Sequence, residues 1–81
     1  MTRTDIALEM LMKGKDLKVD DTEWYRTRIM EGVLSDGKKY RVEYNWCKLA
    51  LKVAYCTIIR INKRDGFEHY LGVQKIEGLD F

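Results

Sequence analysis

The segment from Trp24 to Tyr44 reads WYRTRIMEGVLSDGKKYRVEY and decides the fold. Apolar and polar residues alternate on both sides of Asp36-Gly37. An Asp-Gly pair between two alternating runs is the strongest short-range signal of a β-hairpin. A two-residue loop at this pair would place Val33 opposite Tyr40, so that apolar partners share one face of the sheet. The segment therefore predicts two antiparallel strands.

A second hairpin is predicted around Asp65-Gly66. Here a three-residue loop, Arg64-Asp65-Gly66, with glycine in the left-handed region, fits the pattern better than a two-residue loop. It pairs Ile59 with Leu71 and Thr57 with Val73, whereas the shorter loop would mix apolar and polar faces.

Five segments have the pattern of strands, and we expect them at residues 17–19, 24–34, 39–45, 48–62 and 67–76. A straight strand over 48–62 would run about 50 Å at 3.3 Å per residue, which is too long for so small a domain. Residues 46–54 are therefore either the first part of a bent or broken strand or a short helix. The β-branched and aromatic residues from Val53 onward favour the strand.

Residues 4–13 are predicted to form a helix. Thr2 or Thr4 can cap its first turn, and Gly14 stands where a left-handed C-cap is expected. Its apolar residues fall on one face at helical spacing. They are Ile6, Ala7, Met10 and Leu11.

Together these elements predict an α+β fold in which one N-terminal helix packs on a four- to five-stranded, mostly antiparallel sheet with two hairpins. The expected core combines the helix stripe with one face of the sheet. Its predicted members are Ile6, Met10, Leu11, Ile29, Val33, Tyr40, Val42, Ile59, Ile61, Leu71 and Val73.

The length of 81 residues fits one domain, and we assign residues 1–81 to a single small α+β domain. The chain is 46% hydrophobic and 35% charged, which is typical of a globular protein. The apolar run from Ile6 to Met12 is too short to span a bilayer, and no signal-peptide pattern follows it. We therefore expect a cytoplasmic protein that has no membrane partner.

Few residues could carry chemistry. His69 is the single histidine, and with Cys47 or Cys56 it could supply two members of a catalytic triad. No local motif supports a triad, and the register above turns His69 inward, opposite Ile61. Two cysteines without C-x-x-C spacing do not fit a zinc site, and there is no glycine-rich phosphate loop. We expect no enzyme activity, no metal and no cofactor.

Charge is the feature of the sequence that points to a function. Between Lys38 and Arg64, eight basic residues are offset by Glu43 alone, which gives this segment a net charge of +7 against +2 for the whole chain. Strand parity predicts one exposed basic face directed away from the helix. Such a face fits an acidic partner or a nucleic acid, although it is also typical of an ordinary solvated sheet face. The candidate binding residues are Arg26, Arg28, Lys39, Arg41, Lys52, Arg60 and Tyr70.

The stretch from Ala7 to Lys15 reads ALEMLMKGK and is followed by a predicted strand and Trp24. This order resembles the opening of many small phage-encoded accessory proteins, roughly A-x-x-x-L-x-x-G-K, a strand and a Trp. Some proteins with this opening sequester nucleotide signals used in host defence. The long hairpins after Trp24 depart from that group, so the resemblance implies a phage origin more than a particular activity. It carries over only Gly14 and Trp24, in structural roles.

These features predict a small non-enzymatic binding protein that inhibits or modulates a host macromolecule, of an anti-defence or host-takeover type. The expected partner is a host protein that offers an acidic surface. The alternatives are a nucleic-acid-binding module that uses the basic face, and a protein that sequesters a small nucleotide. A homodimer is compatible with each, because a chain of this size buries a modest share of its surface.

Overall fold

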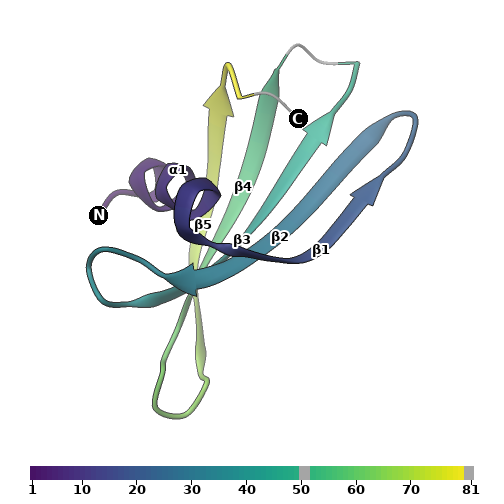
Figure 1. The fold of residues 1–81 in the computed structure, drawn as a ribbon. Helices are drawn as coiled ribbons and strands as arrows, with labels where there is room; N and C mark the ends of the chain where they lie inside the picture. The colour runs from purple at the N-terminus through teal and green to yellow at the C-terminus, as the bar shows by residue number, and fades with distance from the viewer. Residues whose placement is uncertain (50–51, 80–81) are drawn as a thin grey trace.

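The computed structural model describes residues 1–49 and 52–79 of the chain. One helix is followed by five strands (Figure 1). These elements are α1 (Arg3–Lys13), β1 (Lys15–Asp21), β2 (Tyr25–Val33), β3 (Lys39–Cys47), β4 (Val53–Ile61) and β5 (Glu68–Glu77). The predicted α+β class, with a helix packed on an antiparallel sheet, is confirmed.

All five strands form one antiparallel sheet in which each strand pairs with the next along the chain. Helix α1 crosses one face of this sheet and contacts β2, β3, β4 and β5. We call the opposite face, which no other helix or strand of the described residues covers, the open face. Successive turns alternate between the two ends of the sheet. The β2–β3 and β4–β5 turns therefore project at one end, and the β1–β2 and β3–β4 connections lie at the other (Figure 1).

The sequence of α1 provides both its start and its buried face. The Thr2 hydroxyl accepts a hydrogen bond from the Asp5 N–H, and the Asp5 carboxylate accepts one from the Thr2 N–H, each at 3.1 Å. This capping box satisfies two backbone donors that a helix start leaves unpaired. Ile6, Ala7 and Met10 are buried against the sheet. No helix within residues 1–49 and 52–79 is long and apolar enough to cross a membrane.

Gly14 ends the helix for a reason that differs from the predicted one. Its φ of −78° is extended, so the predicted left-handed cap is wrong. A Cβ at this position would lie 2.3 Å from the Met10 Sδ and 2.7 Å from the Met10 carbonyl oxygen. A Cβ on Gly32 of β2 would lie 3.2 Å from the Gly14 Cα. The two glycines therefore let the end of α1 approach the β2 backbone closely.

The turn between β2 and β3 has three residues, 35–37, rather than the predicted two. The Leu34 N–H donates to the Lys38 carbonyl at 3.0 Å and closes this loop. Gly37 has a φ of +79°, a backbone angle that residues other than glycine rarely adopt. The Asp-Gly signal thus located the turn correctly, but it did not specify the loop length.

The extra loop residue reverses the faces of β2, because neighbouring side chains of a strand point to opposite sides. Val33 pairs with Lys39 rather than with Tyr40, and it is 52% exposed on the open face. Ile29 is half-buried on the same face. Met30 takes the predicted core position and is fully enclosed.

The pairing of β4 with β5 keeps the predicted register in one half and loses it in the other. Thr57 lies opposite Val73, as predicted. A bulge beyond this pair then places Ile59 opposite Tyr70, so the predicted pairing of Ile59 with Leu71 is wrong. A bulge leaves one residue of the longer strand without a direct partner and increases the local twist.

The β4–β5 turn has four residues, 63–66, which is one more than predicted. The Asn62 N–H donates to the Phe67 carbonyl at 2.8 Å, and the Gly66 N–H donates to the Asn62 carbonyl at 2.7 Å. Gly66 has a φ of +76°, which confirms the predicted left-handed position.

The core fills the space between α1 and the sheet face beneath it. The structure buries the predicted core residues Ile6, Met10, Tyr40, Val42 and Ile61, the last of them on the open face. Leu11 and Leu71 are partly buried against the core. Four predicted core residues lie on the open face and are half-buried or exposed. They are Ile29, Val33, Ile59 and Val73.

The prediction is wrong for these four residues because it reversed the faces of β2 and β4, and with β4 the face of the part of β5 that pairs Val73 with Thr57. The core residues that the prediction missed lie in α1, next to the β2–β3 turn, or on the side of the sheet that faces α1. They are Ala7, Met30, Leu34, Tyr44, Trp46, Ala54, Cys56 and Ile58.

A turn interrupts the strand structure between β3 and β4. β3 ends at Cys47 and β4 begins at Val53. The described residues of 46–54 contain no helix, but Lys48, Leu49 and Lys52 lie in a turn rather than in the predicted strand; residues 50–51 lie outside the description. The Leu79 N–H donates to the Lys52 carbonyl, and the Trp46 Nε1–H donates to the Leu79 carbonyl, each at 3.1 Å. The chain after β5 is therefore docked over Trp46 as far as Leu79.

Candidate anion-binding site

The predicted basic face is divided between the two sides of the sheet. Arg26, Arg28 and Arg60 lie on the side that carries α1, because they pair with buried residues of β3. Lys39 and Arg41 lie on the open face. The prediction that these side chains share one face is therefore wrong, and its cause is the reversed parity of β2 and β4.

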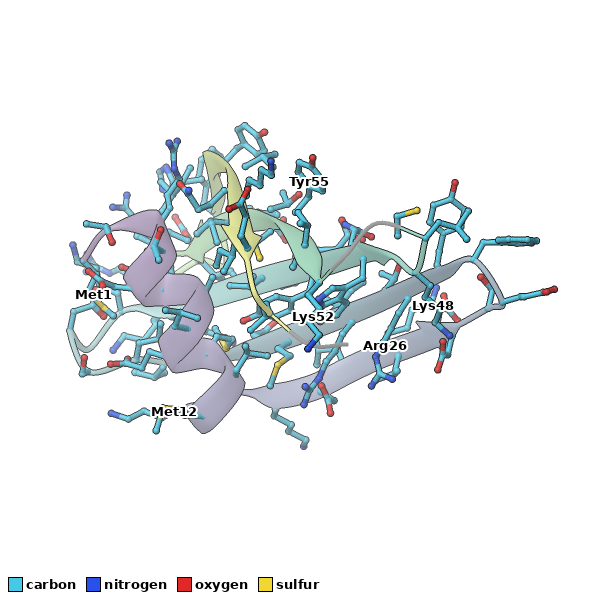
Figure 2. All side chains as sticks on the ribbon, turned by 90° about the horizontal axis from the view of Figure 1, so that it is seen from above. Met1, Met12, Arg26, Lys48, Lys52 and Tyr55 are labelled. Atoms are coloured by element: carbon cyan, nitrogen blue, oxygen red, sulfur yellow. The ribbon has the colours of Figure 1, made fainter. Side chains whose placement is uncertain are left out.

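Lys52 lies in the β3–β4 connection, at the end of the sheet opposite to the two Asp-Gly turns. Figure 2 shows Arg26 and Lys48 on the side of the sheet that carries α1, with Tyr55 directed to the other side. Arg26 and Lys48 both form an ion pair with Asp21 of β1, at 3.5 Å for Arg26. The acids of β1 therefore compensate much of the positive charge in this region.

Two further predicted cations are held by bidentate ion pairs. Arg28 donates to the Asp16 carboxylate from Nε at 2.6 Å and from Nη2 at 3.2 Å. Arg41 donates to the Glu68 carboxylate at 2.5 and 3.1 Å. These hydrogen bonds lower the pKa of both carboxyl groups. Because their charges are already matched, these arginines attract an external anion weakly.

A cleft of about 430 Å³ lies between the β2–β3 turn and the β4–β5 turn. Five of its eight lining residues are lysine or arginine, and none is acidic. A concave wall that carries one sign of charge concentrates the electrostatic field and attracts anions. We call this feature the basic cleft; it is lined by Lys38, Lys39, Arg60, Ile61, Asn62, Lys63, Arg64 and His69.

The meander brings these residues together from the two ends of the +7 segment. Lys38 and Lys39 follow the first Asp-Gly pair, and Arg60 to Arg64 precede the second. Antiparallel pairing of β3 with β4 sets Lys39 opposite Ile61 and so places the two basic groups side by side. Five of the eight basic residues of the +7 segment therefore gather at one end of the sheet, a location that the sequence analysis did not predict.

The carboxylates next to the cleft are occupied in holding the turns. Asp36 accepts hydrogen bonds from the Tyr40 hydroxyl at 2.6 Å and from the Lys38 N–H at 2.9 Å, and these bonds lower its pKa. Burial, together with Asp36, raises the pKa of Tyr40 to about 12. Asp65 accepts a bond from the Phe67 N–H at 2.9 Å. Both carboxylates therefore stabilise turn backbone and do not line the cleft.

The cations of the cleft differ in how they are held. The Lys63 ammonium donates to the Gly37 carbonyl at 2.7 Å and so connects the two turns. Lys39 forms an ion pair with Glu31 at 2.9 Å. Three further cleft cations have no carboxylate of residues 1–49 or 52–79 within ion-pair distance, namely Lys38, Arg60 and Arg64. These three are the side chains best placed to meet an anion.

An aromatic pair lies next to these cations. His69 lines the cleft opposite Arg60, so the prediction that it faces Ile61 is wrong. Its ring meets Phe67 edge to face, with 4.8 Å between ring centroids, and Phe67 is 61% exposed. Tyr70, by contrast, pairs with a residue of the open face and does not line the cleft.

A smaller hollow of about 200 Å³ lies at the other end of the sheet. The half-exposed rings of Tyr25 and Tyr55 stand on either side of β3 there, and the Thr27 hydroxyl donates to the Asn45 side chain at 3.0 Å. Among the residues that the structure describes, Arg26 is the one charged residue that lines this hollow. It therefore lacks the concentration of charge found in the basic cleft.

The described residues contain no group of three or more His, Cys, Asp or Glu side chains placed to hold a metal ion. Burial raises the pKa of the Cys56 thiol to about 12, so this thiol stays protonated and unreactive near neutral pH. Cys47 is half-buried and lines the smaller hollow. Neither cysteine lines the basic cleft with His69.

The sequence prediction omitted four residues of this region, although the sequence contains the signal for them. Each Asp-Gly turn is flanked by a basic pair, Lys38-Lys39 or Lys63-Arg64. Two hairpins in a meander, joined by one further connection, place their turns at the same end of the sheet. This rule would have brought the two pairs together. The omitted residues are Lys38, Lys63, Arg64 and Phe67.

No family model matches the chain, and comparison with curated proteins and with solved structures found no match either. The resemblance of the N-terminal stretch to phage accessory proteins therefore stays a prediction.

Proposed function

We propose that this chain is a small binding protein that holds a nucleic acid by its phosphates in the basic cleft. The observation that supports the proposal is a concave site with five lysines and arginines and no acidic lining residue. Contacts from Lys and Arg to phosphates supply most of the sequence-independent affinity for nucleic acids. The nucleic-acid-binding alternative from the sequence thus gains support, but at the turns rather than on a sheet face.

The chemistry of the cleft favours binding over catalysis. His69 is the one imidazole among the lining residues and the side chain there that could serve as a general acid or base. No Ser, Thr, Cys, Tyr, Asp or Glu is among the described lining residues to work with it. A set of positioned cations is suited to holding an anion by its charge.

An acidic protein surface would meet the same cations, and this is the partner expected from the sequence. Phosphates differ from carboxylates because each nucleotide of a strand carries a charge at a regular spacing, and binding releases condensed counterions. An inhibitor of a host protein therefore remains the second candidate, and the experiment below includes an acidic polypeptide to distinguish the two.

The test is titration of a fluorescein-labelled oligonucleotide, followed by anisotropy at several salt concentrations. The variant Lys38→Ala/Arg64→Ala removes two cleft cations that have no acid partner in the described structure. The matched control is Lys18→Ala/Lys75→Ala, which removes the same net charge from β1 and β5. Lys63 is left intact because it connects the turns. Only the cleft variant should weaken binding. The negative slope of log K against log salt should become less steep by about 0.7 for each phosphate that the variant no longer binds.

Three outcomes would count against the proposal. Absence of binding at low salt would reject it. Equal weakening in both double variants would show that net charge acts without the cleft. If poly-glutamate competes as well as an oligonucleotide of equal charge, an acidic protein becomes the favoured partner.

A further inference from the structure

Phe67 is an apolar ring in an exposed position at the edge of a charged site. It follows the β4–β5 turn directly, and its side chain is 61% exposed. Its backbone is fixed on both sides, because its N–H donates to Asp65 at 2.9 Å and its carbonyl accepts from the Asn62 N–H at 2.8 Å. The ring of His69 meets it at an interplanar angle of 64°. An edge-to-face neighbour leaves a face of the Phe67 ring available for stacking.

We propose that the basic cleft takes single-stranded nucleic acid and that an unpaired base stacks on Phe67. The inference rests on the proposed function and narrows its ligand. Sites for single strands combine a basic groove for the backbone with aromatic side chains on which bases stack. The bases of a duplex are already stacked on each other, so they cannot offer a face to Phe67 without unpairing.

The sheet register places the ring of Phe67 and the cleft cation Arg60 on the same side. His69 lies opposite Arg60 on the helix side of the sheet, and Phe67 precedes His69 by two residues, which is the spacing of one strand face. Arg64 lies three residues before Phe67 on the same turn. A strand whose phosphates contact Arg60 would therefore pass His69, and the Phe67 ring that contacts His69 lies on the same side of the sheet.

The experiment compares three probes: a short labelled oligothymidine, its duplex with oligoadenine, and inorganic polyphosphate as an unlabelled competitor. Phe67→Ala should weaken oligothymidine binding roughly 5- to 150-fold, which corresponds to the loss of one stacked base. The affinity for polyphosphate, which has no bases, should be unchanged when it is calculated from the competition curve. Phe67→Tyr should retain binding, and Phe67→Leu, which keeps apolar bulk without a π-face, should not.

Tyr70→Ala is the matched control, because Tyr70 is 67% exposed on the open face and does not line the cleft. It should leave all three affinities unchanged. Circular dichroism of each variant checks that the fold is retained. If the Phe67→Ala variant lost its fold, the comparison of Phe67→Tyr with Phe67→Leu would decide the question.

The outcomes distinguish a failure of the stacking inference from a failure of the proposed function. If the duplex binds more tightly than the single strand, or if Phe67→Ala and Phe67→Leu keep wild-type affinity for oligothymidine, the stacking inference is wrong while phosphate binding stands. If neither oligonucleotide nor polyphosphate binds at low salt, the proposed function fails and the stacking inference fails with it.

Discussion

Ile58 and Ile59 are neighbours in β4, have the same side chain and lie on opposite faces of the sheet. Ile58 is 0% exposed beneath α1, whereas Ile59 is half-buried on the open face. Truncation of a buried isoleucine leaves a cavity and removes apolar packing, so Ile58→Ala should lower the free energy of unfolding by roughly 2–5 kcal/mol. Ile59→Ala should cost clearly less. Urea denaturation of both variants measures this, and equal losses would contradict the assigned faces.

Gly14 allows a second prediction for a single residue. A Cβ there would overlap both the side chain and the carbonyl of Met10, and the φ of −78° gives no advantage to residues that tolerate the left-handed region. Gly14→Ala and Gly14→Asn should therefore both lower the melting temperature, and asparagine should be no better than alanine. At a left-handed C-cap asparagine would be the better replacement. A more stable Gly14→Asn variant would contradict the close-approach explanation.

At the scale of elements, β1 depends on β2 for its place. Each residue of β1 is exposed. The bidentate ion pair between Asp16 and Arg28 connects the first half of β1 to β2. The hydrogen bonds from Arg28 lower the pKa of Asp16 from its ordinary value of 3.8. A lowered pKa in the folded state contributes stability above the unfolded pKa, and this contribution is lost as the pH falls through the folded pKa.

The third prediction follows from this linkage. The urea midpoint of the wild type should exceed that of Asp16→Asn at pH 6, and the difference should shrink progressively as the pH falls below 3.8 and through the lowered folded-state pKa of Asp16. In an Arg28→Gln background, Asp16→Asn should have no such pH-dependent effect. A difference between wild type and Asp16→Asn that persists unchanged at low pH would show that the ion pair is not its cause.

The hairpins show which part of an element the sequence specifies. Asp36-Gly37 and Asp65-Gly66 identified both turns, and Gly37 and Gly66 have the positive φ that such turns need. The loop lengths depend on hydrogen bonds that close the turn, and an error of one residue reverses a whole strand face. The existence of the strands was therefore predictable, while the face of β2 was not.

The faces of β4 were ambiguous for a different reason. Its inward residues include Ala54 and Cys56, which are small, while larger residues such as Tyr55 point outward. Small residues lie inward because close packing against Tyr44, Trp46 and α1 leaves little room there. Apolar side chains thus occur on both faces of β4, so hydrophobic alternation could not identify the buried one.

At the scale of the whole molecule, the candidate site depends on two turns that are distant in sequence and adjacent in space. The +7 segment predicted a basic surface, but strand parity predicted it on a sheet face, whereas Arg28 and Arg41 are paired with acids on opposite faces. The basic cleft arises from the topology, because the meander places both Asp-Gly turns at one end. Three cations that have no carboxylate partner among the described residues, Lys38, Arg60 and Arg64, therefore lie together at the end of the sheet that carries both Asp-Gly turns.

This polarity leads to the fourth prediction, which compares Arg60→Glu with Arg41→Glu. Both changes alter the net charge equally, and both residues belong to the +7 segment. Arg60 lines the basic cleft, whereas Arg41 is bound to Glu68 on the open face. Arg60→Glu should slow association with an oligonucleotide strongly at low salt, because an acidic side chain would then stand in the path of the phosphates. The effect should shrink toward 1 M salt, where the Debye length falls to about 3 Å.

Arg41→Glu should act on the fold instead, because it breaks the pair with Glu68 and places two acids together. Its melting temperature should fall, while the association rate of the folded fraction should stay close to that of the wild type. Stopped-flow fluorescence with the labelled oligonucleotide gives the rates, and thermal unfolding gives the stability of each variant. If both reversals slowed association equally at every salt concentration, the partner would respond to the charge of the whole molecule, and the basic cleft would not be its site.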